Sequence, residues 1–119
     1  MAETTYHGGC QCGAVRYRVD LDLTKPAITC NCSMCGRAGT MLQFAPASKF
    51  SLESGEDRLT DYQFNKRAIH HLFCKTCGIK SFSRGKNAEG GDTVAINVRC
   101  LDDVDLASVP TQAFDGKSR

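Results

Sequence analysis

The sequence has no tryptophan, only three prolines, and just three tyrosines and six phenylalanines among its 119 residues. It also lacks any apolar stretch near the ~20 residues that a membrane-spanning helix needs. The N-terminal residues Met1–Tyr6 contain no basic start and no apolar run, so no secretory signal is recognisable. We therefore expect a cytoplasmic protein that has no membrane partner and a modest hydrophobic core.

An excess of charge of one sign is missing as well. Fifteen Lys and Arg residues face thirteen Asp and Glu residues, which leaves a formal net charge of +2. The longest basic clusters are Lys66-Arg67 and the tail Lys117–Arg119, too short for the positive stripe of a nucleic-acid-binding surface. The charge pattern therefore argues against nucleic acid as a partner.

Helical periodicity is almost absent, and short alternating segments take its place. Between Ala14 and Asp20 every second residue is apolar, which is typical of a half-buried strand. The same reasoning predicts strands over 27–29, 40–45, 50–52, 59–64, 69–73, 79–83 and 93–98. The best helix candidate is the short segment 105–108, and the residues after Pro110 are weakly patterned. Short strands separated by turns predict an all-β fold, with residues 1–119 as a single domain.

Eight cysteines form three clusters and one isolated residue. The clusters are Cys10-Gln-Cys12, Cys30-Asn-Cys32-Ser-Met-Cys35 and Cys74-Lys-Thr-Cys77, and Cys100 stands alone. A disulfide framework is the alternative to metal binding. A reducing cytoplasm disfavours disulfides, and a ring closed over two or three residues would be strained. The spacing therefore favours metal, and we expect two Zn²⁺ per chain.

The two metal sites are expected to differ. If Cys10 and Cys12 lie on a strand, they project from one face and join Cys74 and Cys77 in a closed four-thiolate site of structural type. Cys30, Cys32 and Cys35 would leave one coordination position open, as catalytic zinc sites do. The alternative is a second closed site in which Cys100 or a histidine is the fourth ligand. Cys100 could also be a buried thiol without a role.

Longer motifs around these cysteines resemble a known family. They are Gly8-Gly-Cys-Gln-Cys-Gly-Ala-Val-Arg-Tyr17, Cys30–Cys35 and His71-Leu-Phe-Cys-Lys-Thr-Cys-Gly78, with further similarity at 62–65, 79–82, 100–102 and 114–116. The sequence resembles the glutathione-dependent formaldehyde-activating enzymes, a family that includes centromere protein V. The resemblance implies an Mss4-like fold of twisted antiparallel sheets pinned by zinc. It also implies that Cys10, Cys12, Cys74 and Cys77 bind structural zinc and that Cys30, Cys32 and Cys35 bind catalytic zinc.

The activity that the resemblance implies is that of a carbon–sulfur lyase. A small thiol such as glutathione would add to an aldehyde, giving an adduct such as S-hydroxymethylglutathione, or the adduct would break down. The expected pocket wall consists of Arg37, Gln43, Phe44, His71 and Phe73. Two alternatives remain: a zinc-stapled binding module without turnover, and a redox enzyme similar to methionine sulfoxide reductases that uses Cys100.

Overall fold

The computed structural model describes residues 3–63, 69–87 and 89–116, and its strands form two sheets. One sheet has the order β1-β2-β5 and the other the order β10-β3-β4-β9-β8-β7-β6. In chain order the strands are β1 Thr4–Gly9, β2 Arg16–Leu21, β3 Ala27–Cys30, β4 Leu42–Pro46, β5 Phe50–Ser54, β6 Leu59–Tyr62, β7 His70–Cys74, β8 Phe82–Lys86, β9 Asp92–Asn97 and β10 Thr111–Phe114. The helical segments are α1 Ser33–Ala38 and the 3₁₀ turns η1 Ala47–Lys49, η2 Glu56–Arg58, η3 Val98–Cys100 and η4 Leu106–Ser108.

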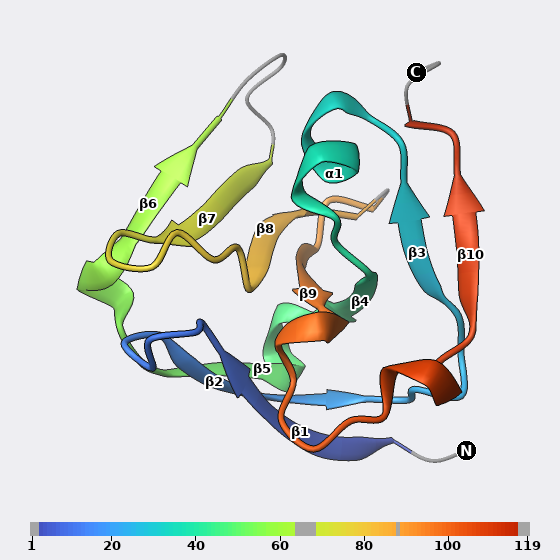
Figure 1. Ribbon diagram of the computed structural model, residues 1–119, viewed down its shortest axis with the longest axis horizontal. Coiled ribbons are helices and arrows are strands. Elements are labelled where there is room, and N and C mark those ends of the chain that lie inside the picture. The colour runs from blue at the N-terminus through green and yellow to red at the C-terminus, as the bar shows by residue number, and fades with distance from the viewer. Residues whose placement is uncertain (1–2, 64–68, 88, 117–119) are drawn as a thin grey trace.

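The larger sheet curves around α1 (Figure 1). Strands β6 and β7 stand on one side of the helix, and β3 and β10 stand on the other. The three-stranded sheet crosses the opposite end of the molecule and packs against the central strands. The all-β class expected from the sequence is confirmed, and the only α-helix of the described residues has six residues.

Some elements were not predicted from the sequence, and others differ from the prediction. Residues 4–9 form β1, and residues 111–114, which the sequence left without a pattern, form β10. Strand β10 pairs parallel to β3, so the larger sheet is not entirely antiparallel. Residues 79–81 precede β8 rather than belong to it, and the helix expected at 105–108 is the 3₁₀ turn η4. Strand β6 ends at Tyr62, while Phe64 and the basic clusters at 66–67 and 117–119 lie outside the described residues.

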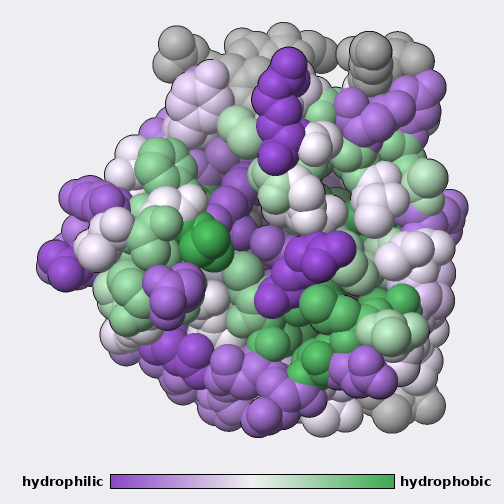
Figure 2. All heavy atoms as spheres, in the orientation of Figure 1, coloured by the Kyte–Doolittle hydropathy of each residue, from purple (hydrophilic) through white to green (hydrophobic). Residues whose placement is uncertain are grey.

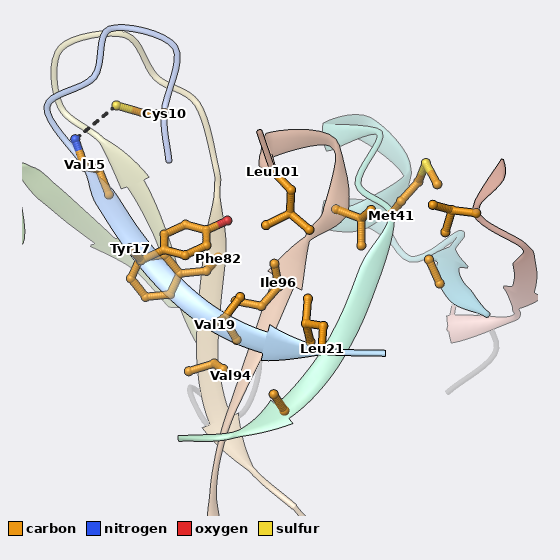
Figure 3. Close-up of a cluster of buried hydrophobic side chains, with 14 of the residues drawn as sticks. Cys10, Val15, Tyr17, Val19, Leu21, Met41, Phe82, Val94, Ile96 and Leu101 are labelled. Atoms are coloured by element: carbon orange, nitrogen blue, oxygen red, sulfur yellow. Dashed lines mark hydrogen bonds between the residues drawn. The ribbon is translucent and has the colours of Figure 1, made fainter. Parts of the chain in front are cut away.

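The hydrophobic core lies between the two sheets. Tyr17 and Val19 of β2 are fully buried and face Phe82 of β8 and Ile96 of β9 (Figure 3). The Tyr17 and Phe82 ring centroids lie 5.6 Å apart in an edge-on arrangement. The Tyr17 hydroxyl donates to the Ser81 carbonyl at 3.2 Å, so its one polar atom is satisfied. The alternation read from Ala14 to Asp20 therefore does mark the buried face of β2.

The two faces of the larger sheet have different roles because side chains alternate along each strand. On β9, Val94 and Ile96 enter the core, whereas Thr93 and Ala95 point to the opposite face and line a cavity. On β4, Ala45 faces the core, and Leu42 and Phe44 face the cavity. The same strands thus supply the core and the walls of the candidate site.

The surface of the molecule is mixed. Figure 2 shows hydrophobic side chains gathered over the segment between β9 and β10, bordered by hydrophilic ones. Val104 and Leu106 of this segment are partly buried and pack against the core. No helix of the described residues is long and apolar enough to cross a membrane.

Replacement of Ile96 tests the position of the core. Ile96→Ala removes a fully buried side chain from the contact between the sheets. We expect the free energy of unfolding to fall by about 2–5 kcal/mol, measured by urea unfolding at a fixed zinc concentration. Gln112→Ala, on the exposed strand β10, is the control and should change it by less than about 0.5 kcal/mol. Equal effects of the two substitutions would show that this core is wrongly placed.

Candidate metal centres and a cavity

Four cysteine thiols meet where the two sheets join. Cys10 and Cys12 come from the turn after β1, and Cys74 and Cys77 come from the end of β7 and the turn that follows it. The four Sγ atoms lie within 4.8 Å of one another, with Cys10–Cys12 at 3.6 Å and Cys12–Cys74 at 3.7 Å. Four thiolates on one zinc ion, each about 2.3 Å from it, stand about 3.8 Å apart. The donor set and its spacing therefore fit a tetrahedral metal site.

The backbone around this cluster turns more sharply than the sequence predicted. Cys10 and Cys12 do not lie on a strand, because β1 ends at Gly9. The Cys10 N–H donates to the Val15 carbonyl at 3.1 Å, and Gly13 has a φ of 85°. A positive φ suits glycine, which has no Cβ to clash. A tight turn, and not the two-residue period of a strand, directs both thiols to the same point.

Backbone N–H groups favour the thiolate form that metal binding requires. The Val15 N–H donates to Cys10 Sγ at 3.3 Å, and the Thr76 N–H donates to Cys74 Sγ at 3.3 Å. Hydrogen bonds to Cys74 Sγ, first from the Cys77 N–H, lower the pKa of Cys74 to about 6. Cys100 Sγ lies nearby, 4.0 Å from the Lys80 carbonyl oxygen, and burial raises its pKa to about 11.

The second cluster is built by β3 and the start of α1. Cys30 ends β3, Cys32 is the N-cap of α1, and Cys35 lies within the helix. Their Sγ atoms also lie within 4.8 Å of one another. Burial alone would raise the pKa of Cys32, but the Cys35 N–H, which donates to its Sγ at 3.3 Å, helps to lower it. Among the described residues, no fourth His, Cys, Asp or Glu approaches all three thiols as closely.

The C-terminal strand holds this cluster from the other side. The Asn31 N–H donates to the Phe114 carbonyl at 3.2 Å, and Asn31 Nδ2 donates to Asp115 Oδ1 at 3.0 Å. A Cβ added to Gly116 would lie 2.5 Å from Cys30 Sγ. Gly116 is therefore in direct contact with a candidate metal ligand, and a larger residue there would displace one of the two.

The three-cysteine cluster opens into a cavity of about 290 Å³. The floor is one cross-strand row of the larger sheet, in which Phe44 pairs with Ala95, Ala95 with Ser83, and Ser83 with His71. Small side chains in the middle of this row leave the space free. The other lining residues include four large apolar ones and three basic ones: Ile28, Leu42, Ile69 and Phe114, and Lys80, Arg84 and Lys86.

Two of the five residues expected in the pocket wall, Phe44 and His71, line this cavity. Arg37 lies outside it, on an exposed part of α1, and donates to the Ser33 carbonyl at 3.2 Å. Gln43 points the opposite way and donates to the carbonyls of Asp22 and Lys25 at 3.0 and 2.8 Å. Phe73 lines a separate hollow.

Sequence reasoning missed several lining residues. Lys80 lies three residues after Cys77, and Phe114 lies in the segment that had no clear pattern. The parallel pairing of β10 with β3 brings Phe114 to the site, and no local sequence signal predicts such a pairing. The position of Lys80 after the Cys74–Cys77 turn was the available signal, because residues next to a metal-binding turn are held in a fixed place.

Two basic side chains in the cavity influence each other. Burial, and then the charge of Lys80, lower the pKa of His71, so its imidazole is neutral at neutral pH. Burial also lowers the pKa of Lys80, while attraction to Cys35 and Cys32 opposes that effect. Beside the three-cysteine cluster the cavity therefore combines thiols, a neutral imidazole and the ammonium group of Lys80.

Comparison with known proteins agrees with this arrangement. The family description "Glutathione-dependent formaldehyde-activating enzyme" matches residues 5–115. A crystal structure of a protein from Rhodobacter sphaeroides superimposes with a TM-score of 0.76 at 34% sequence identity, over 89% of this chain and 99% of that one. The family match includes both cysteine clusters. The chain therefore belongs to the glutathione-dependent formaldehyde-activating enzyme family.

Proposed function

We propose that the protein is a zinc-dependent enzyme of the carbon–sulfur lyase type that acts on the adduct of a small thiol and an aldehyde, such as S-hydroxymethylglutathione. The observation that carries the proposal is the difference between the two clusters. Four thiols lie at the junction of the sheets, whereas three thiols line a cavity large enough for a small substrate. Catalytic zinc sites keep such an open position, and structural sites do not.

Cys10, Cys12, Cys74 and Cys77 would hold a structural zinc ion, and Cys30, Cys32 and Cys35 would hold a catalytic one. When bound, the catalytic ion lowers the pKa of a thiol placed beside it, which makes thiolate available at neutral pH. The hydrogen bonds from backbone N–H groups to Cys30 and Cys32, at 3.4 and 3.3 Å, orient these ligands before the metal arrives.

The remaining steps belong to the protein and its substrate. In the addition direction the thiol sulfur forms a bond to the aldehyde carbon, the carbonyl π electrons move to oxygen, and that oxygen takes a proton. The net change moves one proton from sulfur to oxygen, and the breakdown of the adduct reverses it. His71 is neutral and lines the cavity, so it is placed to accept the thiol proton. The apolar walls, including Phe44 and Phe114, keep water away from the reacting carbon.

Cys32→Ser tests the reaction. This variant keeps the four-cysteine cluster and is expected to fold, but its rate of breakdown of S-hydroxymethylglutathione should fall by about 100-fold or more. Release of formaldehyde measures the rate. Cys100→Ser, which removes the thiol outside both clusters, is the matched control and should retain turnover. Native turnover in Cys32→Ser would contradict the mechanism. Reduction of a sulfoxide substrate by the native protein, lost in Cys100→Ala, would instead favour the redox alternative.

Measurement of the zinc content distinguishes the two proposed metal sites. We expect two zinc ions per chain in protein purified without oxygen, and one in Cys32→Ser. Cys74→Ser should instead lower the free energy of unfolding by more than about 4 kcal/mol, because it removes a ligand at the junction of the sheets. Elemental analysis and denaturant unfolding measure the two effects. A single zinc ion in the native protein would rule out the second site.

Gly116 provides a test of the second site that leaves every cysteine in place. In Gly116→Ala the new methyl group competes with Cys30 Sγ for space, so we expect a 10- to 100-fold loss of zinc affinity at the three-cysteine cluster only. Competition with a chelator measures this affinity. Gly36→Ala is the control, because it lies in α1 beside Cys35 and its new Cβ would be 3.5 Å from the nearest atom. Equal zinc affinity in both variants would show that Gly116 does not control the site.

A further inference from the structure

Three cationic residues line the cavity, and two of them are already engaged. Lys86 Nζ lies 2.5 Å from Asp92 Oδ1, so a carboxylate offsets its charge. The Arg84 guanidinium lies over the Phe50 and Phe82 rings, 5.2 and 5.4 Å from their centroids, on the core side of the sheet. The third is Lys80, for which no ion pair with a carboxylate is found within the described part of the chain.

Lys80 stands beside the three-cysteine cluster. It lines the cavity together with Cys32 and Cys35 and is attracted by both thiols. No Asp or Glu is among the described residues that line the cavity. A cation in an apolar surrounding without a carboxylate is costly unless an anion balances it. The cavity therefore has a position that favours a negatively charged group.

The backbone around Lys80 is fixed on both sides. The Lys80 carbonyl accepts a hydrogen bond from Asn97 Nδ2 at 3.1 Å. The next carbonyl, that of Ser81, accepts one from the Tyr17 hydroxyl at 3.2 Å and one from the Asn97 N–H at 3.0 Å. Tyr17 is fully buried and Asn97 is buried as well, so these hydrogen bonds tie Lys80 to the core. The fixed backbone gives the Lys80 side chain a defined point of attachment, which suits it to position a substrate group.

We propose that Lys80 binds an anionic oxygen of the substrate next to the three-cysteine cluster. This inference rests on the proposed function, because it assigns a partner to a group in the same cavity. The oxygen has two possible sources: a carboxylate carried by the thiol, or the oxygen of the reacting carbon, which gains negative charge when the carbon–sulfur bond forms. Both accept a charge-assisted hydrogen bond from an ammonium group.

Charge balance within the protein is the competing explanation. Three thiolates and one Zn²⁺ carry a net charge of −1, which Lys80 could offset without touching substrate. That role predicts that removal of the Lys80 charge weakens zinc binding at this cluster. Substrate binding predicts that both zinc ions stay and that recognition of the anion is lost.

The experiment compares Lys80→Met and Lys80→Arg with Lys86→Met, which removes another cation that lines the cavity. The probes are mercaptoacetate and its methyl ester, two small thiols that differ in one negative charge. Calorimetry measures their binding to the zinc-loaded proteins, and formaldehyde release measures breakdown of their hydroxymethyl adducts. Lys80→Gln is a second variant if Lys80→Met does not fold, and zinc content and thermal unfolding are recorded for all.

Two results would support the proposal and identify the oxygen. If Lys80→Met weakens the binding of mercaptoacetate by about 10- to 100-fold and changes the affinity for the ester by less than about threefold, Lys80 binds a carboxylate. If both thiols bind as they do to the native protein but adduct breakdown slows by about 100- to 1000-fold, Lys80 binds the oxygen of the reacting carbon. In either case Lys80→Arg should restore part of the loss, and Lys86→Met should behave as the native protein does.

Three results would overturn it. These are equal behaviour of Lys80→Met and Lys86→Met in every measurement, loss of one zinc ion in Lys80→Met, and failure of the native protein to bind either thiol. Absence of turnover in a native protein that binds mercaptoacetate through Lys80 would contradict the lyase function alone. The binding measurement therefore separates failure of this inference from failure of the proposed function.

Discussion

The contact of four thiols between the β1–β2 turn and the end of β7 is the constraint on which the rest of the structure depends. It joins residues 62 positions apart in the sequence and brings the three-stranded sheet against the larger one. The core between the sheets contains few large side chains, so packing alone supplies limited stability. A metal ion at this contact would hold the sheets together, and the fixed position of β7 would in turn place His71 on the cavity floor.

The two faces of the larger sheet have different roles, because one packs into the core and the other lines the cavity. Val94 and Ile96 fill the core, while Ala95, between them, faces the cavity. Because Ala95 and Ser83 are small, the row between Phe44 and His71 stays hollow instead of filling with side chains. Both faces are built on the same strands. A substitution on one face must therefore preserve the strand geometry that the other face needs.

What could be predicted from the sequence depends on how far apart along the chain the interacting residues lie. Strand β2 was found because its alternation is local, and the three-cysteine cluster was found because its spacing is local. The pairs Cys10/Cys12 and Cys74/Cys77 are local too, and their union followed from the four ligands that a closed zinc site needs. Helix α1 was missed because six residues are too few to show a helical period, although Cys32 caps it. Strand β10 was missed because it forms by pairing with β3, which lies more than eighty positions earlier in the sequence. For the same reason Phe114 could not be assigned to the cavity, whereas Phe44 and His71 lay on strands that the pattern revealed. Lys80 was missed although it follows the Cys74–Cys77 turn by three residues.

The three-cysteine cluster depends on the edge of the larger sheet. Among the described strands β10 has only β3 as a hydrogen-bonded neighbour, and its four residues are exposed. Yet its last residue, Phe114, and the next one, Asp115, each accept a hydrogen bond from Asn31, which lies between the first two ligands. The strand also leads to Gly116, which lies against Cys30. Edge strands open more readily than central ones, so opening of β10 would loosen the ligand geometry at the three-cysteine cluster. A sealed site at the junction and an adaptable one at the edge are what a protein needs if one metal maintains the fold and the other exchanges ligands with substrate.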